Sequence, residues 1–128
     1  TILIDPQNPD ILYAGTEPGG VFKSIDGGEN WKEVNTGFTN SYIYSLSINP
    51  VNSDIVYAGS YGNGLFKSVD VEKIGYQKII DYLTYLLETY LVIRQFRNNN
   101  LGTDGGGVFK STDGGENWIQ KNNGLKNR

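Results

Sequence analysis

The octapeptide Ser24-Ile-Asp-Gly-Gly-Glu-Asn-Trp31 returns almost unchanged as Ser111-Thr-Asp-Gly-Gly-Glu-Asn-Trp118 in this chain of 128 residues. A third copy starts at Ser68-Val-Asp70 and then departs from the pattern. Paired glycines adopt backbone conformations that other residues rarely reach, so each copy indicates a tight turn. A turn that recurs at a fixed spacing indicates a repeat architecture, and this repeat decides the fold class.

The residues around the octapeptide repeat in the same way. Gly20-Val-Phe-Lys-Ser24 returns as Gly64-Leu-Phe-Lys-Ser68 after 44 residues (64 − 20), and as Gly107-Val-Phe-Lys-Ser111 after a further 43 (107 − 64). The alternating segment 42–48 and the short apolar segment 55–58 are typical of strands. Periods of about 40 to 50 residues with short strands are typical of propeller blades, which contain four antiparallel strands each.

The pattern Ser-x-Asp-x-Gly-x-x-Trp resembles the Asp-box of the bacterial neuraminidase repeat class of β-propellers. The preceding Asn49-Pro50 and Asp54-Ile-Val-Tyr-Ala-Gly-Ser60 resemble the sortilin, xyloglucanase and photosystem II assembly-factor branch of that class. The resemblance covers residues 1–70 and 101–121. It implies that the box is a structural element on the blade rim, away from any ligand face. The box residues are Ser24, Asp26, Gly28, Trp31, Ser68, Asp70, Ser111, Asp113, Gly115 and Trp118.

Residues 71–100 have a different composition, with a single glycine at Gly75. Their apolar residues fall at spacings of three and four, which predicts a helix over about residues 76–97 with Asp70 as its N-cap. We therefore expect a mainly β fold with one long helix (α+β), built from propeller-derived antiparallel sheets as an incomplete or rearranged propeller. The apolar helix residues that could form an interface are Ile79, Leu83, Leu86, Leu87 and Tyr90.

The genetic code suggests an origin for this segment. If codons for Asp-Gly-Gly-Glu-Asn-Trp lose one base after the Asp codon, they can read Asp-Val-Glu-Lys-Ile-Gly, which is the sequence of residues 70–75. We hypothesise that a frameshift rewrote this blade, and a natural insertion is the alternative. A coding region for residues 71–100 that does not resemble the neighbouring repeats would contradict the frameshift.

We expect one domain, in which residues 1–70 form about two blade-like repeats. Residues 71–100 form the anomalous segment, and residues 101–128 form a partial blade hairpin and tail. Blades bury their faces against neighbouring blades, so two and a fraction blades leave sheet faces uncovered. Self-association, membership of a longer chain and a rearranged compact fold are all compatible with this. We expect a homo-oligomer that associates through the helix or an exposed sheet.

Composition excludes several classes of function. The net charge is −3 and the lysines are scattered, so no basic patch indicates nucleic-acid binding. Charged residues interrupt the expected helix, so we expect no transmembrane segment. The chain has neither Cys nor His, and we expect no disulfide, metal or other cofactor. The resemblance is compatible with an extracytoplasmic location, which the residues themselves leave open.

The box aspartates could be read as catalytic acids, but Asp and Ser in such turns usually bond to their own backbone. No carboxylate pair lies in a glycosidase motif, so a glycoside hydrolase fragment is the reading we favour least. We expect no catalytic residues and no enzyme, but a structural scaffold domain. The alternative is a protein- or carbohydrate-binding module. The tyrosines that could line a glycan or peptide face are Tyr13, Tyr42, Tyr44 and Tyr61.

Overall fold

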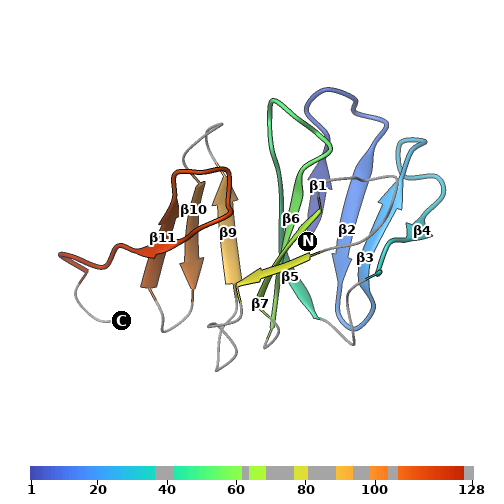
Figure 1. Ribbon diagram of the computed structural model, residues 1–128. Helices are drawn as coiled ribbons and strands as arrows, with labels where there is room; N and C mark the ends of the chain where they lie inside the picture. The colour runs from blue at the N-terminus through green and yellow to red at the C-terminus, as the bar shows by residue number, and fades with distance from the viewer. Residues whose placement is uncertain are drawn as a thin grey trace.

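The computed structural model describes residues 1–36, 42–61, 64–68, 77–80, 89–93, 99–103 and 107–125. Within these ranges the chain forms twelve strands and no helix. The strands make three four-stranded antiparallel sheets that follow one another along the chain (Figure 1). In the part of the chain that is described, nothing helical is long and apolar enough to cross a membrane.

Each sheet contains four strands that are consecutive in the sequence, which is the arrangement of a propeller blade. Blade 1 contains β1 (Ile2–Ile4), β2 (Leu12–Thr16), β3 (Gly20–Ser24) and β4 (Lys32–Glu33). Blade 2 contains β5 (Ile43–Ile48), β6 (Val56–Ser60), β7 (Gly64–Ser68) and β8 (Gln77–Ile80). Blade 3 contains β9 (Thr89–Ile93), β10 (Asn99–Thr103), β11 (Gly107–Ser111) and β12 (Ile119–Gln120).

The helix expected over about residues 76–97 is wrong wherever the structure describes this segment. Two strands lie there instead: β8 pairs with β7, and β9 pairs with β10. The run Thr89-Tyr-Leu-Val-Ile93 is rich in β-branched and aromatic residues, which favour a half-buried pleated surface. The edges of β7 and β10 also offer backbone hydrogen bonds that only an extended chain can accept. Tertiary pairing therefore overrides the helical spacing of the apolar residues.

The residues predicted to form the helix interface therefore have other positions in the structure. Ile79 lies in β8 and Tyr90 lies in β9. Leu83, Leu86, Leu87 and the expected N-cap Asp70 lie outside the described residues. The segment predicted to leave the blade pattern thus provides the last strand of blade 2 and the first strand of blade 3. The described residues thus form three four-stranded sheets.

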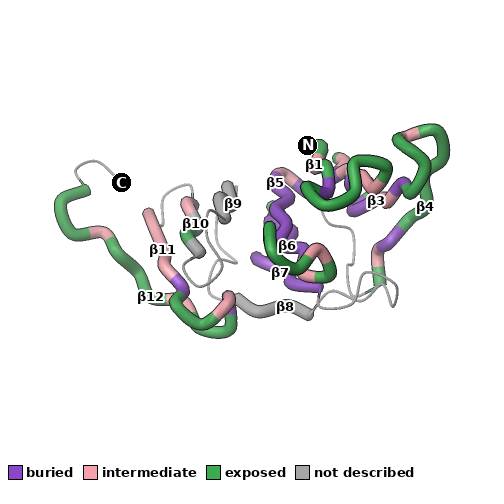
Figure 2. Tube along the Cα trace, turned by 90° about the horizontal axis from the view of Figure 1, so that it is seen from above, coloured by how far each residue is buried: buried purple, intermediate pink, exposed green. Residues whose placement is uncertain are grey.

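Blade 2 is the centre of the molecule. Its strand β5 lies against β1 and β2 of blade 1 and also against β9 of blade 3. Every residue of β6 and β7 is buried. Figure 2 shows the buried segments concentrated in blade 2, with blades 1 and 3 on either side of it. Blade 2 is therefore covered on both faces, whereas each of the other two blades packs against it with one face.

Candidate functional site

The two ends of the strands form two different rims. Strands alternate in direction within a blade, so the β1–β2 and β3–β4 turns lie at one end and the β2–β3 turn lies at the other. The octapeptides occupy the β3–β4 turn of blade 1 and the β11–β12 turn of blade 3. We call residues 24–31 box 1 and residues 111–118 box 3, and we call the end of the blades where they lie the box rim.

Box 1 is closed by side-chain hydrogen bonds to its own turn. The Ser24 hydroxyl donates to the Asp26 carboxylate at 2.8 Å and accepts from the Gly28 N–H at 2.9 Å. The Asn30 backbone and amide N–H groups donate to the same carboxylate at 2.9 and 2.8 Å. The Trp31 indole N–H donates to the Gly28 carbonyl at 3.0 Å. The polar groups of this box thus bond to one another within the turn.

Box 3 repeats this geometry closely. Ser111 donates to Asp113 at 2.8 Å and accepts from the Gly115 N–H at 2.8 Å. The Asn117 backbone and amide N–H groups donate to Asp113 at 2.9 and 2.7 Å, and the Trp118 indole donates to Gly115 at 2.9 Å. In the middle copy, Ser68 is buried at the end of β7, and Asp70 lies outside the described residues.

The hydrogen bonds give the two box carboxylates a strongly acidic character. The backbone N–H of Asn30 is the largest cause that lowers the pKa of Asp26 to about 2, followed by the amide of Asn30 and the hydroxyl of Ser24. The pKa of Asp113 is likewise lowered to about 2, chiefly by the backbone and then the amide of Asn117. A general acid that works near neutral pH needs a much higher pKa. The geometry favours a structural role for both aspartates over proton donation.

An asparagine four residues after each box tryptophan was not singled out from the sequence. The Asn35 side-chain oxygen accepts from the Val21 N–H at 2.6 Å, and Asn122 accepts from the Val108 N–H at 2.8 Å. Each asparagine therefore ties the chain after the last strand of its blade to the start of the third strand. Its recurrence at the same distance from Trp31 and Trp118 is the signal that could have identified it.

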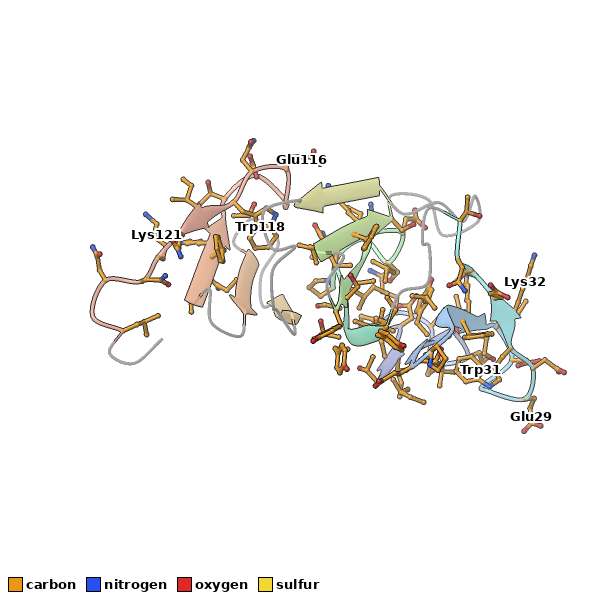
Figure 3. The ribbon with its side chains drawn as sticks, turned by 90° about the horizontal axis from the view of Figure 1, so that it is seen from below. Glu29, Trp31, Lys32, Glu116, Trp118 and Lys121 are labelled. Atoms are coloured by element: carbon orange, nitrogen blue, oxygen red, sulfur yellow. The ribbon has the colours of Figure 1, made fainter. Side chains whose placement is uncertain are left out.

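Box 3 also makes a contact between blades 2 and 3, in addition to the contact of β9 with β5 and β6. The Tyr57 hydroxyl on β6 donates to the Gly114 carbonyl at 2.6 Å. The Lys67 ammonium on β7 forms an ion pair with Glu116. A Cβ at Gly115 would lie 2.9 Å from the Tyr57 ring, so the turn and the ring are in close contact. Figure 3 shows Glu116 on the side of blade 3 that faces blade 2.

Equivalent residues lie at the same register in the other two blades. Tyr57 is opposite Lys67 on neighbouring strands of blade 2. Tyr13 is opposite Lys23 in blade 1, and Asn100 is opposite Lys110 in blade 3. Each blade thus presents a lysine at the same position of the same face, and the residue opposite it is Tyr, Tyr and then Asn.

The four tyrosines expected to share a binding face do not lie together. Tyr13 is buried in the core, where burial first and then the carboxylates Asp5 and Asp54 raise the pKa of its hydroxyl. Tyr42 and Tyr61 are exposed at the rim opposite the boxes, where the Tyr61 N–H donates to the Tyr42 carbonyl at 2.9 Å. The Tyr44 ring is 5.9 Å from that of Tyr61, at 56° between planes. The Tyr44 and Tyr61 rings therefore form a pair with Tyr42 at the same rim, and we call these three residues the rim tyrosines.

Among the described residues, no group of three or more His, Cys, Asp and Glu side chains is arranged to hold a metal ion. Side-chain hydrogen bonds of the described residues close the box turns, join blade 1 to blade 2 through Ser53 and Asp5, and join blade 2 to blade 3 through Tyr57 and Gly114. These features can close turns and hold one blade against another.

No protein-family model matches the chain, and no curated protein matches it by sequence. Solved structures match it over most of its length. An ancestral GH74 enzyme superposes with a TM-score of 0.76 at 20% identity, over 93% of this chain and 17% of that one. YCF48 from Cyanidioschyzon merolae gives a TM-score of 0.71 at 19% identity, over 92% and 35%.

The GH74 xyloglucanase from Xanthomonas campestris gives a TM-score of 0.72 at 16% identity, over 92% of this chain and 21% of that one. The chain thus spans well under two thirds of the length of these structures. Identities at this level show the fold and not the activity. The chain therefore has a β-propeller-like fold that matches Asp-box propellers of the GH74 and YCF48 kinds.

Proposed function

We propose that the chain is a non-catalytic structural domain that associates with a second copy through its exposed blade faces and so completes a propeller ring. The observation that supports this proposal is a comparison within the molecule. Ile2 and Ile4 on β1 are 64% and 55% exposed. Leu46 and Ile48, which hold the same register positions on β5, are only 9% and 8% exposed.

The difference in exposure comes from the neighbouring blade and not from the residue type. Leu46 and Ile48 lie on β5, which packs against blade 1, whereas no described residue covers the same positions on blade 1. Exposed branched apolar side chains at a position that the fold elsewhere buries mark a surface that favours a partner. Another blade has the right shape for this surface, because the molecule already places one blade on the equivalent surface of the next.

Two copies together supply a number of blades that is typical of closed propellers. Each copy contains three blades, and closed propellers typically contain about four to eight. Two copies arranged head to tail supply six blades and two identical seams. An interface between two different surfaces generates a closed ring when the rotation closes, and the ring that we propose closes after two copies.

Light scattering coupled to size-exclusion chromatography tests this proposal. We expect a particle of twice the chain mass of 14.2 kDa. The variant Ile4→Asp should be monomeric, because the new carboxylate would have to be buried in the seam. Val51→Asp is the matched control, since Val51 is 58% exposed and lies in the β5–β6 turn, outside the blade faces. A wild-type chain that is monomeric at every concentration would contradict the proposal.

A second candidate function is supported by the rim tyrosines. Tyr42 and Tyr61 are exposed beside each other, and aromatic faces of this kind present an apolar surface next to a polar hydroxyl. One of the similar structures is a xyloglucanase, and another is YCF48 bound to D1 peptide. Titration with xyloglucan oligosaccharides tests the carbohydrate version of this reading. Binding that Tyr61→Ala abolishes and Ile25→Ala leaves intact would support it, and no binding by the wild type would contradict it.

A further inference from the structure

Resting on the proposed two-copy ring, we infer that its seam reproduces the contact between blades 2 and 3. At that seam, Lys110 of one copy pairs with Glu29 in box 1 of a second copy. The inference uses three observations: the repeat of the contact residues, the difference in burial between the two boxes, and the opposite charges at the two ends of the blade array.

The first observation concerns register. In the contact between blades 2 and 3, Lys67 on the third strand of its blade pairs with Glu116 in the box of the following blade. Lys110 holds the position of Lys67 in blade 3, because each is the fourth residue of its strand and lies opposite the second residue of the preceding strand. Glu29 holds the position of Glu116, since the two octapeptides match residue for residue. If blade 1 of a second copy packs against blade 3 of the first, the same geometry places Glu29 of the second copy opposite Lys110 of the first.

The second observation is that the two boxes have the same internal geometry but different surroundings. Gly115 is buried beneath the Tyr57 ring, and a Cβ there would lie 2.9 Å from it. A Cβ at Gly28 would meet only its own Trp31, at 3.7 Å. Trp31 is also exposed, whereas Trp118 is half-buried. Figure 3 shows Glu29 and Trp31 at the outer end of blade 1, away from blade 2.

The third observation is the chemistry of the opposite end of the molecule. Lys110 on β11 is half-buried, and the residues opposite it on both neighbouring strands, Asn100 and Ile119, are exposed. This face of blade 3 therefore presents a cation beside an apolar side chain. Blade 1 presents Glu29 and the exposed Ile2 and Ile4. The two ends are thus complementary in charge, and each carries apolar surface that the other can cover.

Among the residues that make the contact between Tyr57, Lys67 and box 3, one has a different equivalent at the seam. Asn100 replaces the tyrosine that Tyr57 provides in blade 2, so the hydroxyl that bonds to Gly114 has no equivalent at the seam. The carbonyl of Gly27, which corresponds to that of Gly114, would meet a shorter side chain. The seam should therefore be weaker than the contact between blades 2 and 3, and Asn100→Tyr should tighten it.

Charge reversal in the full chain tests the pairing, with the dimer dissociation constant measured by sedimentation equilibrium. Glu29→Lys and Lys110→Glu should each weaken dimerisation by about tenfold or more, because each places like charges at both seams. The double variant should return to within a few-fold of the wild type. Glu17→Lys, which makes the same charge change in the β2–β3 turn at the opposite rim, should have no effect.

Mixing the two single variants gives the sharpest result. In a head-to-tail ring, one seam then joins wild-type Lys110 to wild-type Glu29, and the other joins the two reversed charges. The mixture should therefore dimerise although each variant alone is weakened, which also shows that both variants are folded. Recovery in the mixture and in the double variant supports the seam, and its absence in both overturns the seam.

The outcomes separate this inference from the proposed ring. A wild-type dimer whose affinity is the same in both single variants leaves the ring in place and overturns the Lys110–Glu29 seam. A wild-type monomer overturns both. Asn100→Tyr gives an independent measurement, because a tightened dimer supports the seam and an unchanged or weakened dimer contradicts it.

Discussion

The Tyr57 hydroxyl forms a hydrogen bond between blade 2 and box 3, and its removal measures how much this bond contributes to the free energy of unfolding. The Tyr57 ring is buried, and its hydroxyl donates to the Gly114 carbonyl at 2.6 Å across a separation of 57 residues in the chain. Tyr57→Phe keeps the ring in place beneath Gly115 and deletes this donor. The variant therefore tests the hydrogen bond and not the packing.

The expected loss follows from the environment of the two groups. A hydrogen bond between neutral groups contributes about 1 kcal/mol net to the free energy of unfolding. The Gly114 carbonyl is half-buried, so water can replace part of the lost bond and the loss should not exceed about 1.5 kcal/mol. For a chain of this size, that corresponds to a fall in Tm of about 3–6 °C. Tyr57→Ala should cost about 3–5 kcal/mol, because it also leaves a cavity.

Urea unfolding at neutral pH and at one fixed protein concentration provides the measurement. The concentration must be fixed because association stabilises the folded chain. Tyr61→Phe is the matched control, since the Tyr61 ring is exposed at the opposite rim, and its free energy of unfolding should stay within about 0.5 kcal/mol of the wild type. An effect of Tyr57→Phe no larger than that of the control would refute the role given to the hydroxyl.

Three further predictions follow from the boxes. Gly115→Ala should destabilise the chain more than Gly28→Ala in urea unfolding, because both have a positive φ, of 90° and 96°, but only the first meets the Tyr57 ring. Because folding lowers the pKa of Asp113, its carboxylate contributes stability that is present above its ordinary pKa near 4 and is lost as the pH falls toward about 2. Asp113→Asn should therefore make the free energy of unfolding depend less on pH over that range. Asn122→Ala should lower the free energy of unfolding by about 0.5–1.5 kcal/mol, because it deletes the acceptor for the Val108 N–H, and equal stability would contradict a structural role of this hydrogen bond.

The blade pattern could be predicted from the sequence because its determinants are local. Glycine pairs with positive φ, a serine and an aspartate two residues apart, and a tryptophan five residues later are all contained in one turn. Copies of such a turn at a spacing of 43 or 44 residues indicate the same strands each time. The three sheets confirm the mainly β, antiparallel architecture, and they resemble propeller blades.

The contact between blades could not be predicted, because its partners are distant in sequence. Box 1 and box 3 have nearly the same residues, yet within the described part of the chain only box 3 lies against a tyrosine and a lysine of another blade. No local signal distinguishes Glu29 from Glu116. The helix failed for a related reason, since Tyr90-Leu-Val-Ile93 fits helical spacing and a buried strand equally well. The open edge of β10 then decides the outcome.

The register of blade 3 explains how an atypical segment can still supply a blade strand. Leu46 pairs with Ala58 in blade 2, and Leu91 pairs with Leu101 at the same position in blade 3. From blade 2 to blade 3, the first strand is displaced by 45 residues (91 − 46) and the second by 43 (101 − 58). This difference of two is taken up by a shorter connection between β9 and β10. A shift by one residue would place every side chain on the opposite face, whereas a shift by two leaves each face unchanged. A frameshift that rewrites the residues of such a strand is therefore compatible with the blade, provided that apolar residues recur at every second position.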